Sequence, residues 1–377
     1  MKIILVTETF GPKGFGVGKV LNGLVKLYGC NQVTYKILAP FVDDPENLLA
    51  EHENALVPYW EHKFLWHPKQ QEFFEEEISY FAPDLIHIHG VFTNIQHSVV
   101  KAAIDTSVPL LLSSHGMLAP WLWQRHSYSY SFVKRLYWNL WMKPVLRKVS
   151  YIHAITKIEA THLKQEFPAI PQILIPNVID LNQIAEPSEK QSPEKFFVFL
   201  GRLHPVKGVD LLIRAYYQAH LGDSWQLVIA GPDFNPTYGQ ELRQLVVKLG
   251  LSDHVDFIGP VYGRQKYALL SKAWGAVVPS YSEVVALVNL EAAAVLTPTI
   301  TTTGTGLHDW AESGGLLIET DIDSLTKALQ SAAAWPLDER LRRGTQARAF
   351  VQERYSWQAV GPRWIKAYQK IASEELG

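Results

Sequence analysis

Residues 196–208 read Phe-Phe-Val-Phe-Leu-Gly-Arg-Leu-His-Pro-Val-Lys-Gly: an apolar run, a glycine, and a loop that carries Arg202 and Lys207. An uninterrupted apolar run of this length is typical of a strand that is buried on both faces, as in a parallel sheet covered by helices. Similar short runs recur along the chain, with helix-like segments between most of them. The pattern predicts an α/β protein built from Rossmann-like, doubly wound parallel sheets.

The expected strands fall into two sets. The first set is 2–6, 34–38, 84–89, 109–113, 151–154 and 172–175; the second is 196–200, 226–230, 255–258, 276–278, 299–302 and 315–318. Between them the pattern lapses into a polar stretch, 186–192. We therefore expect one domain over 1–180 and another over 181–356. The last segment, 357–377, carries an apolar stripe, and by analogy with other two-domain enzymes we expect it to cross back to the first domain.

Composition excludes several classes of protein. With 377 residues, 47% hydrophobic and 19% charged, the chain has the size and composition of two ordered globular domains. The formal net charge of −2 and the lack of a binding motif argue against a nucleic-acid partner. A single cysteine cannot form an internal disulfide, and the first residues do not resemble a signal peptide. The expectation is a cytoplasmic protein.

The loop after the 196–200 run has the chemistry of a diphosphate site. Gly201 ends the strand, the guanidinium of Arg202 can bind two oxygens at once, and Lys207 supplies a point charge. Together the two cations could stabilise the charge on a departing nucleoside diphosphate without a metal ion. Either cation alone is more often a solvated surface group.

Two glutamates suit hydroxyl groups. Glu283 follows the strand end Pro279-Ser280-Tyr281-Ser282, and Glu291 comes eight residues later. If Glu283 begins a helix, the two carboxylates are about 12 Å apart along its axis, which is the length of a sugar diphosphate. Glu283 would then hold the sugar and Glu291 the ribose. The alternative is an ordinary first-turn charge and a partly buried salt-bridge partner.

Three further features are weaker. His115 and His89 each follow an expected strand and could contact a sugar or an acceptor, although a lone histidine is usually structural. Residues 14–18, Gly-Phe-Gly-Val-Gly, open a probable helix and could approach an anion, but they match neither the dinucleotide fingerprint nor a phosphate loop. Asp321 is interpreted as a helix cap. No cluster of residues has metal-site spacing, so no metal and no cofactor are expected.

Segment 121–148 interleaves Trp with Lys and Arg, as interfacial amphipathic segments do. It indicates either contact with the inner face of the plasma membrane or ordinary helices packed in the first domain.

Taken together, these motifs resemble the family 4 glycosyltransferases, which have the GT-B fold and retain anomeric configuration. The resemblance rests on the order and spacing of Gly201-Arg202-Leu203 with Lys207-Gly208, Asn177-Val178-Ile179-Asp180, and Glu283 with Glu291. It implies two Rossmann-like domains facing a cleft: an N-terminal acceptor domain and a C-terminal donor domain.

The resemblance also implies roles for single residues. Arg202, Lys207, Glu283 and His115 would be catalytic, and Trp121 and His89 would meet the acceptor. Donor contacts would come from the following residues: Gly14, Phe15, Gly16, Asn177, Gly201, Ile258, Gly259, Val284, Val285, Ala286, Leu287 and Glu291. Where the family usually has Phe-Gly after the first glutamate, this chain has Val284-Val285-Ala286, which puts the identity of the donor sugar in question.

The resulting hypothesis is a retaining, metal-independent transferase that moves glucose from UDP-glucose onto a polysaccharide or lipid-linked glycan. Two alternatives stay open: a nucleotide-sugar 2-epimerase of the same fold, and a non-catalytic nucleotide-sugar sensor.

Overall fold

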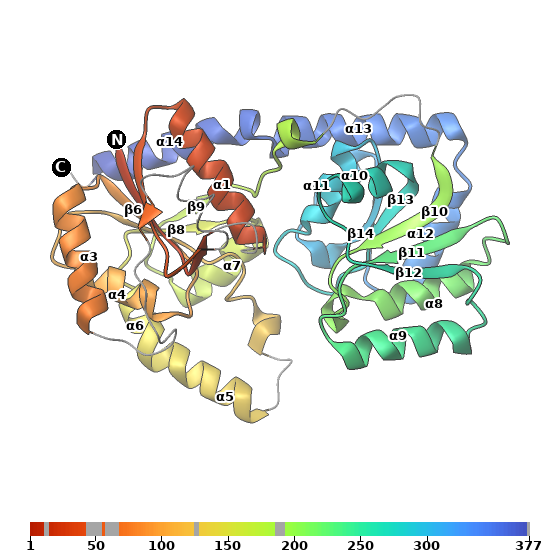
Figure 1. The fold of residues 1–377 in the computed structure, drawn as a ribbon, viewed down its shortest axis with the longest axis horizontal. Coiled ribbons are helices and arrows are strands. Elements are labelled where there is room, and N and C mark those ends of the chain that lie inside the picture. The colour runs from red at the N-terminus through yellow and green to blue at the C-terminus, as the bar shows by residue number, and fades with distance from the viewer. Residues whose placement is uncertain (11–14, 43–54, 57–67, 124–127, 185–192, 375–377) are drawn as a thin grey trace. The chain divides into compact units, whose positions relative to one another are not determined.

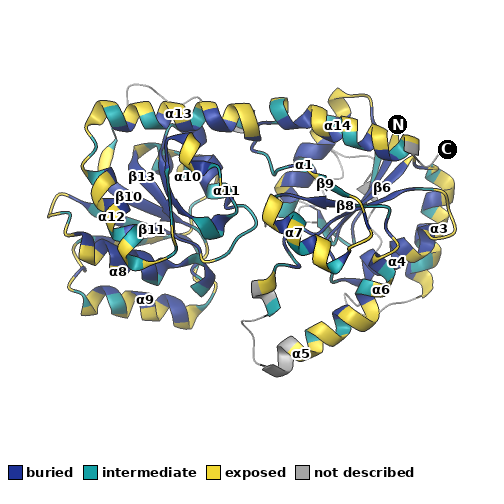
Figure 2. Ribbon diagram, turned by 180° about the vertical axis from the view of Figure 1, so that it is seen from behind, coloured by how far each residue is buried: buried dark blue, intermediate teal, exposed yellow. Residues whose placement is uncertain are grey.

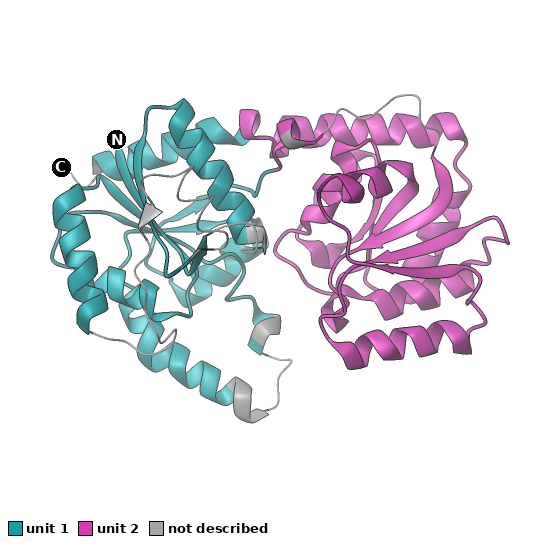
Figure 3. Cartoon of the chain, viewed as in Figure 1, with its two compact units in different colours: residues 1–178, 360–377 teal, residues 179–359 magenta. Residues whose placement is uncertain are grey.

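The computed structural model describes residues 1–10, 15–42, 55–56, 68–123, 128–184 and 193–374, which form two compact units (Figures 1 and 3). Unit 1 comprises Met1–Val178 and Val360–Gly377, and unit 2 comprises Ile179–Ala359. Each unit is built around a parallel sheet. The last helix, α14 (Trp357–Glu374), contributes most of its length to unit 1.

The sheet of unit 1 has seven parallel strands in the order β5-β3-β1-β6-β7-β8-β9. Their bounds are β1 Lys2–Val6, β3 Thr34–Leu38, β5 Ala55–Leu56, β6 Leu85–His89, β7 Leu110–Ser113, β8 Tyr151–Ala154 and β9 Gln172–Leu174. A second, two-stranded sheet pairs β2 (Thr9–Phe10) with β4 (Phe41–Val42). Strands β6 and β7 are buried along their whole length, and they bring His87, His89 and Ser113 into the interior together with their apolar residues.

Helices connect these strands. They are α1 Phe15–Cys30, α3 Pro68–Phe81, α4 Asn94–Ala103, the 3₁₀ helix η2 Pro120–Trp123, α5 Tyr128–Tyr137, the π-helical turn η3 Trp138–Met142, α6 Lys143–Leu146 and α7 Lys157–Glu166. Helix α14 packs against this unit through Val360, Trp364 and Tyr368, three members of the stripe in its sequence, all of them buried.

The sheet of unit 2 has six parallel strands in the order β12-β11-β10-β13-β14-β15. Their bounds are β10 Glu194–Leu200, β11 Gln226–Ala230, β12 Val255–Gly259, β13 Ala273–Val278, β14 Thr299–Thr302 and β15 Leu316–Ile318. The helices of this unit are η4 Leu181–Gln183, η5 Pro205–Lys207, α8 Val209–Ala219, α9 Pro236–Lys248, α10 Gly263–Lys272, α11 Leu287–Ala294, η6 Thr303–Thr305, η7 Trp310–Ser313, α12 Ile322–Ala333 and α13 Leu337–Tyr355. Asp321 caps α12 by accepting a hydrogen bond from the Ser324 amide, as the sequence predicted.

Strand β10 shows why this sheet has two cores. Phe197 and Phe199 point into one cluster with α8, α9 and α12, whereas Phe196, Val198 and Leu200 join a second cluster with α11 and α13. Because successive side chains of a strand alternate between faces, the run Phe196–Leu200 must be apolar throughout. Complete burial of a phenylalanine contributes about 2 to 3 kcal/mol. Figure 2 shows the strands of both units as the buried layer beneath more exposed helices.

Each sheet has a point at which its strand order reverses. In unit 1 this switch point lies between β1 and β6, and in unit 2 between β10 and β13. In open α/β sheets the loops at the carboxyl ends of the two strands that flank such a point diverge and leave room for a ligand. The fold therefore directs attention to residues 7–9 and 89–93 in unit 1, and to 201–208 and 279–286 in unit 2.

No helix among the described residues has both the length and the apolar run that crossing a bilayer requires.

Candidate active site

The candidate site of unit 2 is formed by the two loops that follow β10 and β13. Gly208, at the end of η5, has φ +66°, and a Cβ atom there would lie 2.2 Å from the carbonyl oxygen of Pro279. Only glycine permits that approach. A backbone hydrogen bond of 2.8 Å from Tyr281 to Val206 then joins the loops. Together these contacts fix Lys207 beside the segment that carries Glu283.

Lys207 and Glu283 form an ion pair. The Nζ atom of Lys207 lies 2.6 Å from Oε2 of Glu283, and the two side chains are 19% and 15% exposed. The hydroxyl of Ser280 donates to the other carboxylate oxygen, Oε1. Both oxygens of Glu283 are thus oriented by charge-assisted or hydroxyl hydrogen bonds. The sequence predicted both residues for the site, but as ligands of different parts of a substrate; the structure brings them into direct contact.

The prediction that Glu283 begins a helix is wrong. Helix α11 begins four residues later, at Leu287, after the buried cap residue Ala286. The Glu283 amide donates to the Gly304 carbonyl at 2.7 Å, and the Ala286 amide donates to Thr305 at 3.3 Å. Residues 283–286 are therefore held by the loop after β14, and the proposed helical spacing between Glu283 and Glu291 does not exist.

The segment that departs from the family pattern is tightly packed. Gly306 has φ +75°, and a Cβ atom there would lie 1.9 Å from the Val284 carbonyl oxygen. Val284, Val285 and Leu287 are partly exposed. Their side chains consequently contribute to the surface of the loop that carries Glu283.

Glu291 lies on α11 and is paired with a cation that sequence analysis missed. Its Oε1 atom accepts a 2.8 Å hydrogen bond from Nζ of Lys266, on α10. The two side chains are 7% and 13% exposed, so the pair is largely desolvated. The structure therefore matches the salt-bridge alternative for Glu291.

The remaining predicted residues of unit 2 lie at the carboxyl end of the same sheet. Arg202 is exposed, and its guanidinium carbon lies 4.8 Å from the ring centroid of Phe234. The Gly201 amide donates to Ala230 at 2.9 Å. Ile258, 40% exposed, and Gly259, with φ +74°, end β12.

In unit 1, His89 and His115 meet where β6 and β7 end. Nδ1 of His89 lies 2.8 Å from Nε2 of His115, and the rings are stacked with centroids 5.1 Å apart. Burial, together with His153, lowers the pKa of His115 to about 3. Burial and the neighbouring histidines also hold the pKa of His89 well below its usual value. Both rings are therefore neutral at physiological pH, and one proton is shared in the hydrogen bond between Nδ1 of His89 and Nε2 of His115.

The loop of His115 is held by a buried carboxylate that sequence analysis also missed. Glu159, on α7 and 5% exposed, accepts hydrogen bonds from the Ser114 hydroxyl at 2.7 Å, the Gly116 amide at 2.6 Å and the Ile155 amide at 2.8 Å. His115 itself has φ +50°, an uncommon conformation for a residue with a side chain. Its strained backbone is thus stabilised by contacts on both sides.

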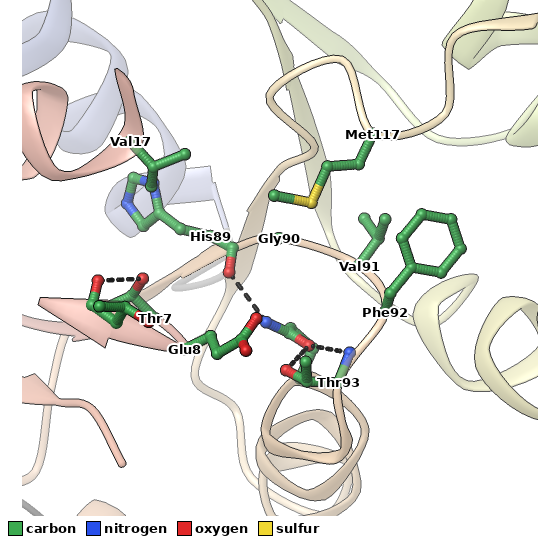
Figure 4. A pocket seen from close by; sticks show the side chains of 11 residues that line it. Thr7, Glu8, Val17, His89, Gly90, Val91, Phe92, Thr93 and Met117 are labelled. Atoms are coloured by element: carbon green, nitrogen blue, oxygen red, sulfur yellow. Dashed lines mark hydrogen bonds between the residues drawn. The ribbon is translucent and has the colours of Figure 1, made fainter. Parts of the chain in front are cut away.

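A cavity of about 240 Å³ opens at the β1/β6 switch point. Figure 4 shows Glu8 reaching toward Thr93, with Met117 and Phe92 on another side of the pocket. Gln96 braces this wall: its amide donates to the His89 carbonyl, and its carbonyl accepts from the backbone and hydroxyl of Thr93. Among the described residues that line it, the one carboxylate is that of Glu8, and there is no Lys or Arg.

Beside the pocket, a chain of hydrogen bonds runs through the core with a fixed direction. Nε2 of His153 lies 2.7 Å from the Ile175 carbonyl, which can only accept, so Nε2 carries the proton. Burial lowers the pKa of His153 to about 4, and its Nδ1 therefore accepts from the Ser113 hydroxyl at 2.8 Å. Ser113 in turn must accept from Nε2 of His87, at 2.7 Å.

The same reasoning extends the chain to α14. Nδ1 of His87 must accept from the hydroxyl of Tyr368 at 3.0 Å, and Tyr368 accepts from the hydroxyl of Tyr28 at 2.9 Å. His87 also stacks on His89, with ring centroids 4.1 Å apart. The last helix, the sheet and the histidines of the site are thus parts of one buried polar network.

Other predicted positions are less informative. Gly14 lies outside the described residues, and α1 begins at Phe15 and includes Gly16. Asn177 is half-buried, just before the division between the units. Trp121 lies in η2. Across the described ranges, no group of three or more His, Cys, Asp or Glu side chains is arranged to hold a metal ion.

The residues that sequence analysis missed come from elements far apart in the chain. Lys266 and Glu159 are ordinary helix charges in the sequence, and Glu8 differs from other glutamates only in following a strand. That strand-end position is the one signal that could have identified Glu8.

Two units, each a doubly wound parallel sheet with polar groups at its switch point, define the GT-B class of glycosyltransferase fold. A family model for glycosyl transferases group 1 matches residues 181–350, and one for glycosyltransferase family 4 matches residues 16–183. The chain therefore belongs to the family 4 glycosyltransferases.

Individual relatives are distant. The chain is 31% identical over 191 residues to an uncharacterised glycosyltransferase of Methanocaldococcus jannaschii, covering 50% of this chain and 47% of that protein. It is 28% identical over 235 residues to a D-inositol 3-phosphate glycosyltransferase of Segniliparus rotundus, covering 57% and 51%. The matches thus span about half the length of these curated relatives.

Among solved structures, HepE of Anabaena in complex with UDP-glucose is similar over 98% of this chain and 100% of that one, with a TM-score of 0.73 and 19% identity. At this identity the likeness concerns the fold.

Proposed function

We propose that the protein transfers glucose from UDP-glucose to a hydroxyl group of a polysaccharide or lipid-linked glycan, with retention of configuration and without a metal ion. The observation that carries the proposal is the desolvated Lys207–Glu283 pair at the β10/β13 switch point. A buried ion pair contributes little net stability by itself, so its place at the ligand-binding edge of the sheet favours a functional role. The complex of HepE with UDP-glucose supports the choice of donor.

In the proposed reaction, Lys207 and Arg202 stabilise the charge that develops on the departing diphosphate. The bond from the anomeric carbon to the diphosphate oxygen breaks, and the acceptor oxygen bonds to the same face of that carbon. The acceptor proton passes to the departing phosphate oxygen, so no protein carboxylate has to act as the nucleophile. Glu283, with its oxygens oriented by Lys207 and Ser280, accepts hydrogen bonds from the sugar hydroxyls.

The pocket of unit 1 supports an uncharged hydroxyl acceptor. Glu8 is the one acidic residue among the described lining residues, and His89 is neutral. A carboxylate accepts hydrogen bonds from a polyol. We therefore propose that a glycan hydroxyl group binds here.

Two measurements test the transfer reaction. UDP-glucose at 100 times its dissociation constant should stabilise the protein by about 2.7 kcal/mol. In a UDP-release assay, Lys207→Ala and Glu283→Gln should each lower the rate about 100-fold or more. Lys272→Ala is the matched control, since Lys272 pairs with Glu194 in the same unit but both side chains are at least half exposed. Full activity in both site variants would refute the mechanism.

The products provide a further check. The anomeric proton of the transferred sugar, followed by NMR, should show the α configuration of the donor. Inversion would contradict the proposed same-face attack. Conversion of UDP-N-acetylglucosamine to its 2-epimer with no acceptor present would identify the protein as an epimerase instead.

A further inference from the structure

Helix α5 and the turn η3 of unit 1 expose a row of apolar side chains. Phe132, Val133, Leu136 and Leu140 are 67%, 63%, 46% and 69% exposed. Positions 132, 136 and 140 are spaced by four, with 133 beside them, so they share one side of the helix. A helix on the surface of a globular protein normally turns such residues toward the core.

The inward side of this segment combines the core residues Trp138 and Met142 with polar groups of Lys134 and Tyr137. Nζ of Lys134 lies 4.4 Å from the ring centroid of Phe92 and 5.2 Å from that of Trp123. The hydroxyl of Tyr137 donates to the Phe92 carbonyl at 3.3 Å. Contact with the faces of aromatic rings stabilises a partly desolvated cation, so these contacts compensate for the partial burial of Lys134. The packing nevertheless leaves the four apolar residues exposed. Figure 2 shows α5 with much of its length coloured as exposed.

The charged residues of this segment are cations. Residues 106–158 contain no Asp or Glu, whereas Arg135, Arg147 and Lys148 are exposed. The carboxylate that contacts the segment, Glu166 on α7, is paired with Lys143 at 2.6 Å. We define the α5 face as Phe132, Val133, Leu136, Leu140 and the partly exposed Trp141 together with these three cations. An apolar centre flanked by Lys and Arg, with an aromatic residue at its end, is suited to lie in the interface of an anionic bilayer.

We propose that the α5 face docks the enzyme on the surface of a membrane rich in anionic phospholipid. The apolar side chains would enter the boundary between headgroups and acyl chains, and the flanking cations would lie among the phosphates. A protein partner of mixed charge would not require an acid-free run of this length. Docking would present a lipid-linked glycan to the acceptor pocket, and this part of the inference rests on the proposed function.

Vesicle binding by the full-length protein tests the proposal. We expect co-sedimentation with phosphatidylcholine vesicles that contain about 30% phosphatidylglycerol, and much weaker binding to pure phosphatidylcholine. Raising the salt to 1 M should weaken binding, because it shortens the Debye length to about 3 Å. Leu136→Glu/Leu140→Glu should lower the partition coefficient at least about tenfold. Arg147→Gln/Lys148→Gln should lower it about fivefold for each charge removed.

Val247→Glu is the matched control, because Val247, on α9 of unit 2, has the same 69% exposure as Leu140. It should leave vesicle binding unchanged. Absence of binding to anionic vesicles, or binding that survives the double glutamate variant, would overturn the proposal. So would a concentration-dependent dimer in light scattering that the same variant abolishes, since the face would then bind a second copy. Stabilisation by UDP-glucose, measured on each variant, reports separately on the donor site.

Discussion

Acidification should unfold unit 1 through its buried histidines. His87, His89 and His153 are at most 2% exposed, and burial lowers the pKa of each below the usual value of about 6.5. The unfolded chain therefore takes up protons below pH 6.5 that the folded chain does not. By linkage, the stability is fully present above that pH and is lost as the pH falls toward the folded pKa values.

The magnitude follows from His153, whose folded pKa is about 4. Between pH 8 and pH 5 the uptake of its proton lowers the free energy of unfolding by about 2 kcal/mol. A histidine with a still lower folded pKa lowers the free energy of unfolding by about the same amount over this interval, because proton uptake by the unfolded chain limits the effect. The three residues together account for about 6 kcal/mol, which is comparable to the whole stability of many domains.

The assay is urea denaturation at half-unit steps from pH 8 to pH 4.5, with unit 1 followed by hydrogen exchange so that each unit is resolved. Below pH 6, His153→Gln should reduce the slope of stability against pH by up to about 1.4 kcal/mol per unit. His308→Gln, an exposed position in unit 2, is the control. A loss of less than about 2 kcal/mol between pH 8 and pH 5, or a titration of His153 near pH 6.5 in NMR spectra, would refute the reasoning.

Three substitutions and one control test individual contacts. Ser113→Ala should destabilise unit 1 by about 2 to 4 kcal/mol in urea denaturation, because it leaves two buried histidine nitrogens without partners. The control is Ser98→Ala: Ser98 is equally buried but makes one 3.1 Å hydrogen bond, so its loss should cost about 1 kcal/mol. Gly208→Ala should lower both the melting temperature and the UDP-release rate, because its Cβ would strike the Pro279 carbonyl; an unaffected rate would show that the contact is dispensable. Glu159→Ala should cost about 3 kcal/mol or more by freeing three buried donors, and a change below 1 kcal/mol would contradict that role.

The fold could be predicted because parallel strands are buried on both faces. Runs such as Phe196–Leu200 have no polar position, so they stand out in the sequence, and the strands expected at 2–6, 34–38 and 226–230 agree with β1, β3 and β11 to the residue. Short edge strands carry no such signal. The strands β2, β4 and β5 were not predicted, because each has two residues, which is too short for an alternating pattern to appear in the sequence.

The start of α11 was mispredicted for a reason that lies elsewhere in the chain. An acidic residue before an apolar segment is a common helix start, and Glu283 fits that pattern. The amides of residues 283 and 286 instead bond to the loop at 304–306, which approaches closely because Gly306 lacks a side chain. A contact between segments some twenty residues apart overrode the local preference, and no local pattern reports it.

The pairing of charges could not be predicted for a related physical reason. Lys207 and Glu283 are 76 residues apart, and Lys266 and Glu291 are 25 apart, so their contacts depend on which strands are neighbours. Once β10 lies beside β13, the loops at their carboxyl ends must meet, and a largely buried lysine requires an anion there. Glu283 supplies that anion. A diphosphate that drew Lys207 away would leave Glu283 in need of new donors, and sugar hydroxyls are such donors, which couples recognition of the two halves of a nucleotide sugar.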